Sequence, residues 1–467
     1  MLYKLKSVKY RFIGILTVGW DGWVKFFFQY VPAKFEFRAM KILLLGSGGR
    51  EHALAWKLAQ SSHCSALFIA PGNAGTAACG TNLDLSPLDF AAVKEFCVNE
   101  GIGMVVVGPE EPLVRGIVDF FAGDAALRKI PVIGPSASGA RLEGSKAFSK
   151  QFMQRHNIPT AAYREFDATN YAEGITYIQQ HSLPVVLKAD GLAAGKGVLI
   201  CQSTIEAVAE FELMVQGNKF GEAGSKVVVE EFLTGIELSV FVLTDGRNFV
   251  ILPEAKDYKR IGEGDKGPNT GGMGAVSPVP FADAVFMEKV NSRIVVPTVK
   301  GLADENIDYR GFIFVGLIKV GDEPYVIEYN CRMGDPETEV VMPRLKNDLV
   351  QLLQAVADGS LDKCVIGQDE RIACTIVAVS GGYPGSYEKG LPISGLDQGL
   401  PADGDTIIFH AGTRAGDGEV LTNGGRVLCV TSFADTVYEA VDKSRDVLEK
   451  IYYDGIYYRR DIGYEFL

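Results

Sequence analysis

The sequence predicts an α/β protein of several domains, and three observations support this. The chain has 467 residues, which exceeds the size at which a single hydrophobic core stops growing. From Lys41 onward, short apolar runs alternate with helical segments, the pattern of a parallel sheet with crossover helices. The 53 glycines follow no collagen-like period, so they indicate many tight loops.

The first folded domain is predicted to be Rossmann-like and to span residues 40–142. Its first helix is expected at His52–Gln60, directly after a glycine-rich turn. Its strands are expected at Ile42–Leu45, Ala66–Ala70, Met104–Val107 and Val132–Gly134.

A second domain is expected at residues 143–365. It begins with a helix at Lys146–His156, and Ser203 with Glu206 predicts a capping box for a later helix. The glycine-rich run Gly262–Gly274 is expected to be a long loop, and loops of this length are usually functional or disordered. The strands of this domain are expected at Pro184–Ala189, Val198–Cys201, Val227–Phe232, Leu238–Leu243, Phe312–Lys319 and Tyr325–Asn330.

The last segment, residues 366–467, is predicted to form a third and smaller domain. It combines short apolar runs with one amphipathic helix near Thr436–Ile451. Its strands are expected at Thr375–Val379, Thr406–His410 and Val427–Thr431.

Residues 1–39 differ from the rest of the chain. They carry seven Lys and Arg against two acidic residues, and they are rich in aromatic side chains. Asp21 and Lys25 interrupt any apolar stretch long enough to cross a bilayer, and no small-residue cleavage site follows Phe12–Gly19. We expect Met40 to be the native start, with the first 39 residues an upstream addition that is disordered or not native.

Charge and cysteine content exclude some classes of partner. The formal net charge of −12 argues against a nucleic-acid or anionic-membrane partner. An anionic substrate must therefore be bound by a few local Lys and Arg residues. The eight cysteines are scattered without metal-ligand spacing, which is typical of reduced thiols in a cytoplasmic protein.

The loop GSGGREHA (Gly46–Ala53) lies between a strand and a helix, so its backbone N–H groups can face an anion. A dinucleotide-binding loop needs a third glycine at position 51, where this chain has Glu51. No acidic residue follows the second strand to hold a ribose. Arg50 indicates a phosphate on a small molecule instead, and a tight turn without a ligand is the alternative.

Three lysines predict a nucleotide-phosphate site. Lys188 lies in PVVLKAD, in phase with Val186, where an unpaired buried ammonium would be costly. The glycine loop GLAAGKGV follows at once and carries Lys196, and Lys146 on the preceding helix adds a third cation. The alternative, a surface strand with solvated lysines, explains one lysine better than three.

The run VVVEEFLTGIE (Val227–Glu237) fits the adenine and ribose end of the same site. A strand that leaves a sheet edge presents backbone groups near Glu230 and Leu233. Glu237 can accept hydrogen bonds from ribose hydroxyls. Taken alone, the run is an ordinary acidic strand end. Its position after Lys188 and Lys196 supports the interpretation as part of a nucleotide site.

The segment VIEYNCRMGDPE (Val326–Glu337) predicts a metal site. Residues two apart in a strand share a face, so Glu328 and Asn330 point the same way. A carboxylate and an amide oxygen suit Mg²⁺, which prefers hard oxygen ligands. Arg332 follows the strand and suits a substrate carboxylate or a transferring phosphoryl group. The alternative is a half-exposed strand with a polar end.

These motifs resemble those of the glycinamide ribonucleotide synthetases, a family within the ATP-grasp superfamily. The resemblance runs from Met40 to the C-terminus. The strings that carry it are GSGGREHA, APGNAGT (Ala70–Thr76), GPEEPLV (Gly108–Val114), LEGSKAF (Leu142–Phe148), KADGLAAGKGV (Lys188–Val198), GPNTGGMGA (Gly267–Ala275), NCRMGDPE (Asn330–Glu337), HAGT (His410–Thr413) and TNGGRVLCV (Thr422–Val430).

The resemblance implies a Rossmann-like N-terminal domain, an ATP-grasp central domain with a mobile lid at about residues 161–232, and a small α+β C-terminal domain. It implies that ATP is bound by Lys146, Lys188, Lys196, Glu230, Leu233 and Glu237. It implies that Glu328 and Asn330 hold Mg²⁺ or Mn²⁺. The implied substrate residues are Gly48, Gly49, Arg50 and Glu51 for phosphoribosylamine, and Asp257, Asn269, Gly271 and Arg332 for glycine and the acyl phosphate. Lys188, Lys196 and Arg332 are the implied catalytic residues.

The implied reaction joins glycine to 5-phosphoribosylamine in purine biosynthesis. ATP converts the glycine carboxylate to glycyl phosphate, and the amine then displaces phosphate. A monomer is the expected state. The alternatives are another ATP-grasp ligase or carboxylase, a nucleotide-binding regulatory or scaffold protein without catalysis, and a dehydrogenase, which Glu51 disfavours.

One feature departs from the wider superfamily. Many ATP-grasp enzymes carry a further metal carboxylate on the strand before the Glu-x-Asn strand. The corresponding segment FIFVGLIKV (Phe312–Val320) has none. Asp335, Glu337, phosphate oxygens and water are the alternatives that could complete the metal ligands.

Overall fold

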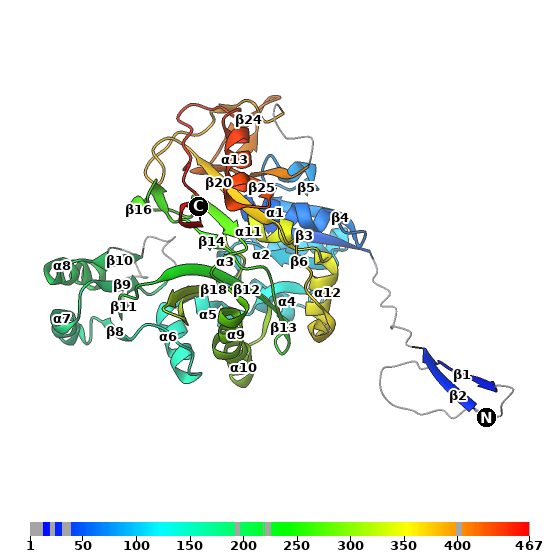
Figure 1. Cartoon of the computed structure of the whole chain (residues 1–467), viewed down its shortest axis with the longest axis horizontal. Helices are drawn as coiled ribbons and strands as arrows, with labels where there is room; N and C mark the ends of the chain where they lie inside the picture. The colour runs from blue at the N-terminus through cyan, green and yellow to red at the C-terminus, as the bar shows by residue number, and fades with distance from the viewer. Residues whose placement is uncertain are drawn as a thin grey trace. The chain divides into compact units, whose positions relative to one another are not determined.

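The computed structural model describes residues 13–18, 24–29, 39–191, 197–217, 219, 226–397 and 404–466 (Figure 1). The chain divides into two compact units, Met1–Ala39 and Met40–Leu467. In the first unit, strands β1 (Ile13–Val18) and β2 (Val24–Gln29) pair antiparallel. Whether the native protein starts at Met40 stays a prediction, as do the boundaries at 142/143 and 365/366.

A parallel sheet forms the first part of the second unit, as predicted. Its order from one edge, β5-β4-β3-β6-β7, is the 3-2-1-4-5 arrangement of a Rossmann sheet when the strands are counted along the chain. The central strands are buried apolar runs because helices cover both faces of such a sheet. The bounds are β3 Met40–Gly46, β4 Cys64–Pro71, β5 Thr81–Asn82, β6 Met104–Val107 and β7 Val132–Pro135.

Five helices belong to this region. They are α1 Gly49–Ala59, α2 Phe90–Glu100, α3 Glu110–Val114, α4 Ile117–Gly123 and α5 Ala137–Gly144. Helix α1 begins three residues earlier than predicted, because the Glu51 carboxylate accepts a hydrogen bond from the Gly48 N–H at 2.6 Å and caps the first turn. The loops after β3 and β6 lie at the position where the strand order reverses, which is where such sheets bind ligands.

The same sheet continues into the second domain through antiparallel strands. Tyr309 of β18 lies opposite Pro135 of β7, and β12, β13 and β19 extend the sheet beyond β18. The sequence predicts these strands individually, but this pairing joins segments more than 170 residues apart and has no local signal. The bounds are β12 Ile236–Thr244, β13 Phe249–Ile251, β18 Tyr309–Val320 and β19 Glu323–Asn330.

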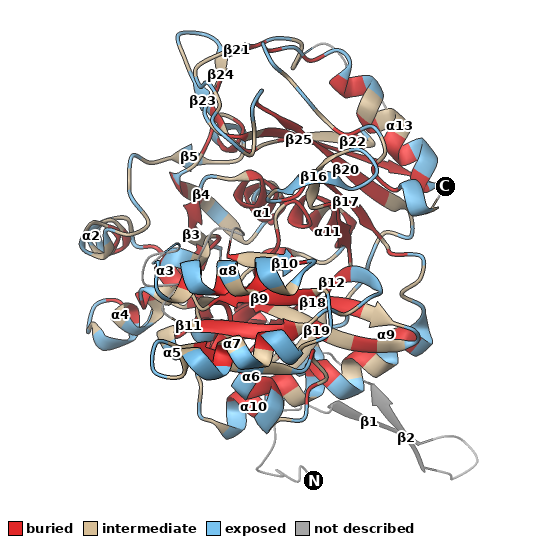
Figure 2. Cartoon of the chain, turned by 90° about the vertical axis from the view of Figure 1, so that its left-hand side faces the viewer, coloured by how far each residue is buried: buried red, intermediate tan, exposed pale blue. Residues whose placement is uncertain are grey.

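A separate four-stranded antiparallel sheet lies within the predicted lid, and helices α7 and α8 cover one of its faces (Figure 2). It has its own hydrophobic core, which includes Phe166, Leu187, Phe211 and Val229. The order is β10-β9-β11-β8, so β11 is an inner strand and the prediction that it forms a sheet edge is wrong. The bounds are α6 Lys146–Arg155, β8 Tyr163–Asp167, α7 Tyr171–Gln180, β9 Val185–Ala189, β10 Val198–Cys201, α8 Thr204–Val215 and β11 Lys226–Glu231.

The predicted capping box of α8 is only half formed. The Ser203 hydroxyl accepts from the Glu206 N–H, as expected. The Glu206 carboxylate accepts from the Gln202 N–H instead of from the N–H of the cap residue Ser203.

The C-terminal region is built on a five-stranded sheet in the order β14-β17-β20-β25-β22, with helix α13 packed against it. Two of these strands come from the second domain, a pairing that the sequence does not reveal. The bounds are β14 Lys256–Asp257, β17 Gly274–Ser277, β20 Ile372–Val379, β22 Thr406–His410, β25 Arg426–Ala434 and α13 Val437–Leu448. A small sheet adds β21 Pro392–Ile393, β23 Thr413–Ala415 and β24 Val420–Thr422.

The run Gly262–Gly274 contains most of a hairpin, so the prediction of a long loop is wrong there. Strands β15 (Arg260–Gly262) and β16 (Lys266–Asn269) pair antiparallel. Glycine and proline in this run hide the strand pattern, because the strands are only three and four residues long.

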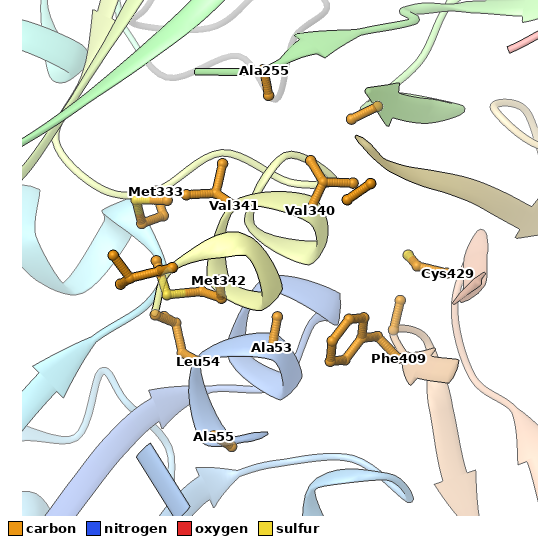
Figure 3. Close-up of a cluster of buried hydrophobic side chains, with 14 of the residues drawn as sticks. Ala53, Leu54, Ala55, Ala255, Met333, Val340, Val341, Met342, Phe409 and Cys429 are labelled. Carbon is orange, nitrogen blue, oxygen red and sulfur yellow. The ribbon is translucent and has the colours of Figure 1, made fainter. Parts of the chain in front are cut away.

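Helices α1 and α11 (Thr338–Arg344) pack together at the centre of the second unit (Figure 3). Leu54 on α1 and Met342 on α11 are both fully buried in this core, together with Phe409 of β22. The remaining α-helices are α9 Ala284–Val290, α10 Val296–Asp304 and α12 Leu349–Asp358. No helix in the described part of the chain has both the length and the apolar character needed to cross a bilayer.

Replacing Leu54 by Ala is expected to lower the free energy of unfolding by about 3 kcal/mol, because the side chain is 1% exposed and its removal leaves a cavity. Urea titration followed by circular dichroism measures the change. Ile205→Ala on α8, where the side chain is 84% exposed, is the control and should shift stability by less than about 0.5 kcal/mol. Equal losses in both variants would contradict the assignment of this core.

Candidate active site

Two adjoining cavities lie where the lid sheet, strands β18 and β19, the β15–β16 hairpin and the loops of the first domain meet. Their volumes are about 400 Å³ and about 230 Å³. They share lining residues, among them Lys188, Glu230, Lys259 and Glu328. The site is therefore one continuous space with a polar part and a more apolar part.

The smaller cavity is the more apolar part. Val186 and Ile200 of the lid sheet face Leu317 and Val326 of the main sheet across it, and Leu233 lies in the segment that connects the two sheets. A flat slot between two apolar sheet surfaces suits an aromatic base. Strand β11 is paired on both sides through Glu230, so the Glu230 backbone already has strand neighbours on both sides.

Lys188 is 5% exposed on β9, and its charge is paired as the sequence argument requires. Its Nζ lies 2.9 Å from Glu230 Oε2 and donates to the Ile327 carbonyl at 3.2 Å. Lys150 of α6 lies 3.2 Å from the other carboxylate oxygen of Glu230 and donates to the Thr160 hydroxyl at 2.7 Å. Burial lowers the pKa of Lys150 to about 8, against the opposing effect of Glu230. The Glu230 side chain thus holds two lysines together.

Lys146 is the first residue of α6 and lines the same cavity. Its Nζ donates to the Gly191 carbonyl at 3.0 Å. The Asp190 carboxylate accepts from the Ser145 hydroxyl at 2.9 Å and from the Ala147 N–H at 3.0 Å. These contacts join the end of β9 to the start of α6 and bring two of the three predicted lysines onto one cavity. Lys196 lies outside the described residues, so its position stays a prediction.

Glu328 and Asn330 both line the larger cavity from β19. Gly316 of β18 lies opposite Glu328, and a Cβ there would come within 3.2 Å of the Glu328 side chain. The close approach of these two strands explains why β18 carries no second carboxylate at this point. Among the described residues, no Lys or Arg is ion-paired with Glu328, and no three His, Cys, Asp or Glu side chains group to hold a metal. The two oxygen donors suit Mg²⁺, with the other ligands left to phosphates and water.

A charge network closes the cavity on the side of the first domain. The Arg332 guanidinium donates to Glu143 Oε1 at 2.6 Å and lies 3.4 Å from Glu110 Oε2. Glu143 also accepts from the Cys331 N–H at 2.8 Å, which holds the end of β19. Arg50 donates to the Met333 carbonyl. Two arginines with their carboxylates therefore face the cavity beside Glu328.

Glu51 explains why the first loop is not a dinucleotide site. Its carboxylate accepts from the Gly48 N–H and pairs with Arg50 Nε at 2.6 Å. A Cβ at Gly108 would lie 2.1 Å from the same carboxylate, so the Glu51 side chain fills the space between the loops after β3 and β6. Of the predicted loop residues, Arg50 lines the larger cavity, whereas Gly48, Gly49 and Glu51 line neither.

The opposite wall carries a second charge group. Lys259 Nζ lies 2.8 Å from Asp257 Oδ1 and 3.1 Å from Glu237 Oε2, so one cation joins a predicted substrate residue to a predicted ribose contact. Glu337 Oε1 accepts from the Ser239 hydroxyl at 2.9 Å. Burial, together with the charge of Asp257, raises the pKa of Glu337 to about 7.

Arg426 of β25 belongs to the same wall. It donates to the carbonyls of Gly271 and Asp335 and is paired with the Asp335 carboxylate at 2.9 Å. Gly271 lines the larger cavity and Asn269 the smaller one.

Sequence reasoning missed several residues that line these cavities. They are Glu110, Glu143, Lys150, Lys259, Asp335, Glu337 and Arg426, of which Asp335 and Glu337 were considered only as metal ligands. Most of them are polar residues within the quoted strings, such as Glu143 in LEGSKAF and Arg426 in TNGGRVLCV. Lys150 and Lys259 lie outside those strings, and only their spatial neighbours reveal them.

Family comparison agrees with this architecture. Models of the phosphoribosylglycinamide synthetase family match three consecutive spans: the N domain over residues 40–143, the ATP-grasp (A) domain over 144–338 and the C domain over 373–465. The predicted order of a Rossmann-like, an ATP-grasp and a C-terminal domain is confirmed. The mobility of the lid stays a prediction.

Individual relatives are similar over nearly their whole length. The chain is 47% identical to phosphoribosylamine–glycine ligase of Pseudomonas aeruginosa over 428 residues, which cover 91% of this chain and 98% of that protein. The ligase of the same name from Vibrio cholerae gives the same identity and coverage.

Solved structures show the same relationship. The crystal structure of phosphoribosylamine–glycine ligase from Thermotoga maritima has a TM-score of 0.78 at 36% identity, over 90% of this chain and 99% of that chain. The biotin carboxylase domain of Hydrogenobacter thermophilus 2-oxoglutarate carboxylase, solved with MgADP, has a TM-score of 0.67 at 18% identity, over 90% and 92%. At that identity the likeness is one of fold alone.

The raised pKa of Glu337 predicts a pH-dependent cost in stability. The pKa of the Glu337 carboxyl in the folded protein, about 7, exceeds the ordinary glutamate value. The contribution of this group to the free energy of unfolding is therefore fully present below about pH 4 and is lost as the pH rises through about 7. Glu337→Gln removes this loss. Relative to the unchanged chain, the variant should gain about 2 kcal/mol more free energy of unfolding at pH 8 than at pH 5.

Urea titrations at the two pH values measure this difference. Glu288→Gln, at an exposed position on α9, is the control and should follow the pH profile of the unchanged chain. Parallel profiles for Glu337→Gln and the unchanged chain would show that the Glu337 carboxyl titrates normally.

Proposed function

This chain belongs to the phosphoribosylglycinamide synthetase family, and we propose from that premise that it joins glycine to 5-phosphoribosylamine. The reaction consumes ATP and gives glycinamide ribonucleotide, ADP and phosphate, a step of purine biosynthesis. The observation that carries the proposal is that Lys146, Lys188, Glu328 and Asn330 line one cavity with Arg332. A phosphate-binding end and an acid-binding end thus share one space.

The nucleotide is proposed to lie across both cavities. The base occupies the apolar slot next to Leu233, and Glu237 accepts from the ribose hydroxyls. Lys146, Lys188 and Lys196 bind the phosphates. Glu230 contributes through its carboxylate, which pairs with Lys188 and holds its ammonium in place rather than contacting the nucleotide.

Glu328 and Asn330 are proposed to hold a divalent metal, Mg²⁺ or Mn²⁺. When bound, such an ion neutralises charge on the nucleotide phosphates. Both lie on one face of β19 and line the larger cavity, and Glu328 also lines the smaller one, which fits an ion that also contacts phosphate oxygens.

The acid and amine substrates are proposed to lie in the polar cavity. Arg332 binds the glycine carboxylate, with Asp257 and Gly271 also in the wall of this cavity and Asn269 beside it in the smaller one. Arg50 binds the phosphate of phosphoribosylamine. A glycine carboxylate oxygen attacks the γ-phosphorus of ATP, the bond to ADP breaks, and glycyl phosphate forms. The amine nitrogen then attacks the acyl carbon and expels phosphate. The side chains act by aligning the reactants and stabilising charge.

The lid sheet is proposed to exclude water from the acyl phosphate, which hydrolysis would otherwise consume. We propose a monomer that acts in the cytoplasm.

Phosphate release tests the function directly. The purified chain is incubated with ATP, Mg²⁺, glycine and phosphoribosylamine, and each component is omitted in turn. Release should need all four. ATP hydrolysis that does not respond to glycine would contradict the proposal and favour a different acid substrate.

Replacing Lys188 by Met should lower kcat/KM for ATP by at least about 100-fold, because the variant keeps the side-chain volume but loses the phosphate-binding charge. The fold should persist, since Glu230 remains paired with Lys150. Lys226→Met is the matched control, because Lys226 lies on β11 of the same sheet and pairs only at the surface with Glu165. Near-normal turnover of Lys188→Met would refute the assigned role.

A further inference from the structure

The β15–β16 hairpin forms part of the wall of the active-site cavity through its two ends. Lys259, just before β15, lines both cavities, and Thr270, just after β16, does so as well. The Thr270 N–H and hydroxyl both donate to the Lys259 carbonyl, at 2.7 and 2.8 Å. The two ends of the hairpin are thus tied together at the cavity, while the strand β16 itself is exposed.

The C-terminal segment Tyr457–Tyr464 holds the hairpin along its length, and Figure 1 shows β16 close to the C-terminus. The Tyr457 hydroxyl donates to the Ile261 carbonyl at 3.1 Å, and the Asp461 carboxylate accepts from the Gly264 N–H at 2.7 Å. The Tyr464 hydroxyl donates to Asp265 Oδ2 at 3.0 Å.

Arg459 is the centre of this contact. Its side chain is fully buried and makes a bidentate pair with Asp461, at 2.8 Å to each oxygen. Its remaining nitrogen donates to the Arg260 carbonyl at 3.1 Å and to Asp265 Oδ1 at 2.6 Å. A buried guanidinium is tolerated only with its charge paired, and the bidentate pair with Asp461 supplies this, while Asp265 links the guanidinium to the hairpin. The Arg260 carbonyl is one residue from Lys259, so Arg459 fixes the backbone that carries this lysine.

Lys259 connects the hairpin to the chemistry of the site. Its ammonium lies 2.8 Å from Asp257, whose side chain is 7% exposed, and 3.1 Å from Glu237, whose side chain is half exposed. The ammonium interacts more strongly with the buried Asp257 than with the exposed Glu237, whose charge is screened by solvent. Movement of the hairpin therefore affects the region around Asp257 more than the region around Glu237.

We propose that Arg459 and Asp265 are positioning residues, which act through the hairpin to place Lys259 for binding of the amino-acid substrate. This inference rests on the proposed function, in which Asp257 lies in the glycine region. The C-terminal segment is then part of the binding machinery for glycine, although none of its residues lines the cavity.

Asp265 offers variants that keep the fold. Its φ of 53° lies in the left-handed region, where Gly and Asn are both accepted, and Arg459 keeps its bidentate pair with Asp461 when Asp265 changes. Asp265→Gly removes both hydrogen bonds to the side chain. Asp265→Asn is the conservative variant, because its amide oxygen still accepts from Arg459.

Two measurements test the inference. In steady-state phosphate release, Asp265→Gly should raise KM for glycine about 10-fold and Asp265→Asn about 2-fold, with kcat and the Kd of ATP changed less than about 2-fold. Hydrogen–deuterium exchange should become faster at the backbone amides of residues 259–270 in Asp265→Gly. Asp322→Asn, which removes a surface ion pair with Lys319 at the β18–β19 turn, is the control and should change neither quantity.

An unchanged KM for glycine in Asp265→Gly would overturn the inference, with or without faster exchange. A parallel loss of kcat, ATP binding and thermal stability would also overturn it, because it would show a general structural role. If the unchanged chain itself releases no phosphate in response to glycine, the proposed function fails first. The exchange measurement still reports on the hairpin in that case, so the two failures are distinguishable.

Discussion

Glu230 holds Lys188 and Lys150, one from the lid sheet and one from helix α6, with a carboxylate oxygen directed to each. Two ammonium groups this close and this buried would repel each other and lose charge without the carboxylate between them. The pairing offsets this repulsion at the proposed nucleotide-phosphate site. It also fixes β9 and β11 relative to α6, so the position of the lid over the main sheet depends on the same contact.

Three further cations that line the larger cavity are each paired with a carboxylate from another element, so this protein of net charge −12 keeps positive groups at the cavity. The pairs are Arg332 with Glu143, Lys259 with Glu237, and Arg426 with Asp335. Each of these pairs joins two elements that are distant in the sequence, so the pairs form only when the chain folds.

Local signals in the sequence predict most of the elements and the residues on the main strands. Lys188 and Glu328 could be predicted because a charge inside an apolar strand needs a partner or a ligand. The pairing of Glu230 with both Lys188 and Lys150 could not be predicted, because these residues lie on three elements that meet only in the folded chain. The hairpin β15–β16 and the inner position of β11 were missed for the same reason, since neither has a distinctive local pattern. Lys196 stays a prediction.

In the proposed mechanism, one cavity activates the glycine carboxylate with the γ-phosphate of ATP and then transfers the acyl group. Glycine labelled with ¹⁸O in both carboxylate oxygens tests this most directly, with ³¹P NMR used to locate the label after turnover. Formation of an acyl phosphate predicts one ¹⁸O atom in each phosphate released. Unlabelled phosphate, or label in a nucleotide product, would contradict the account.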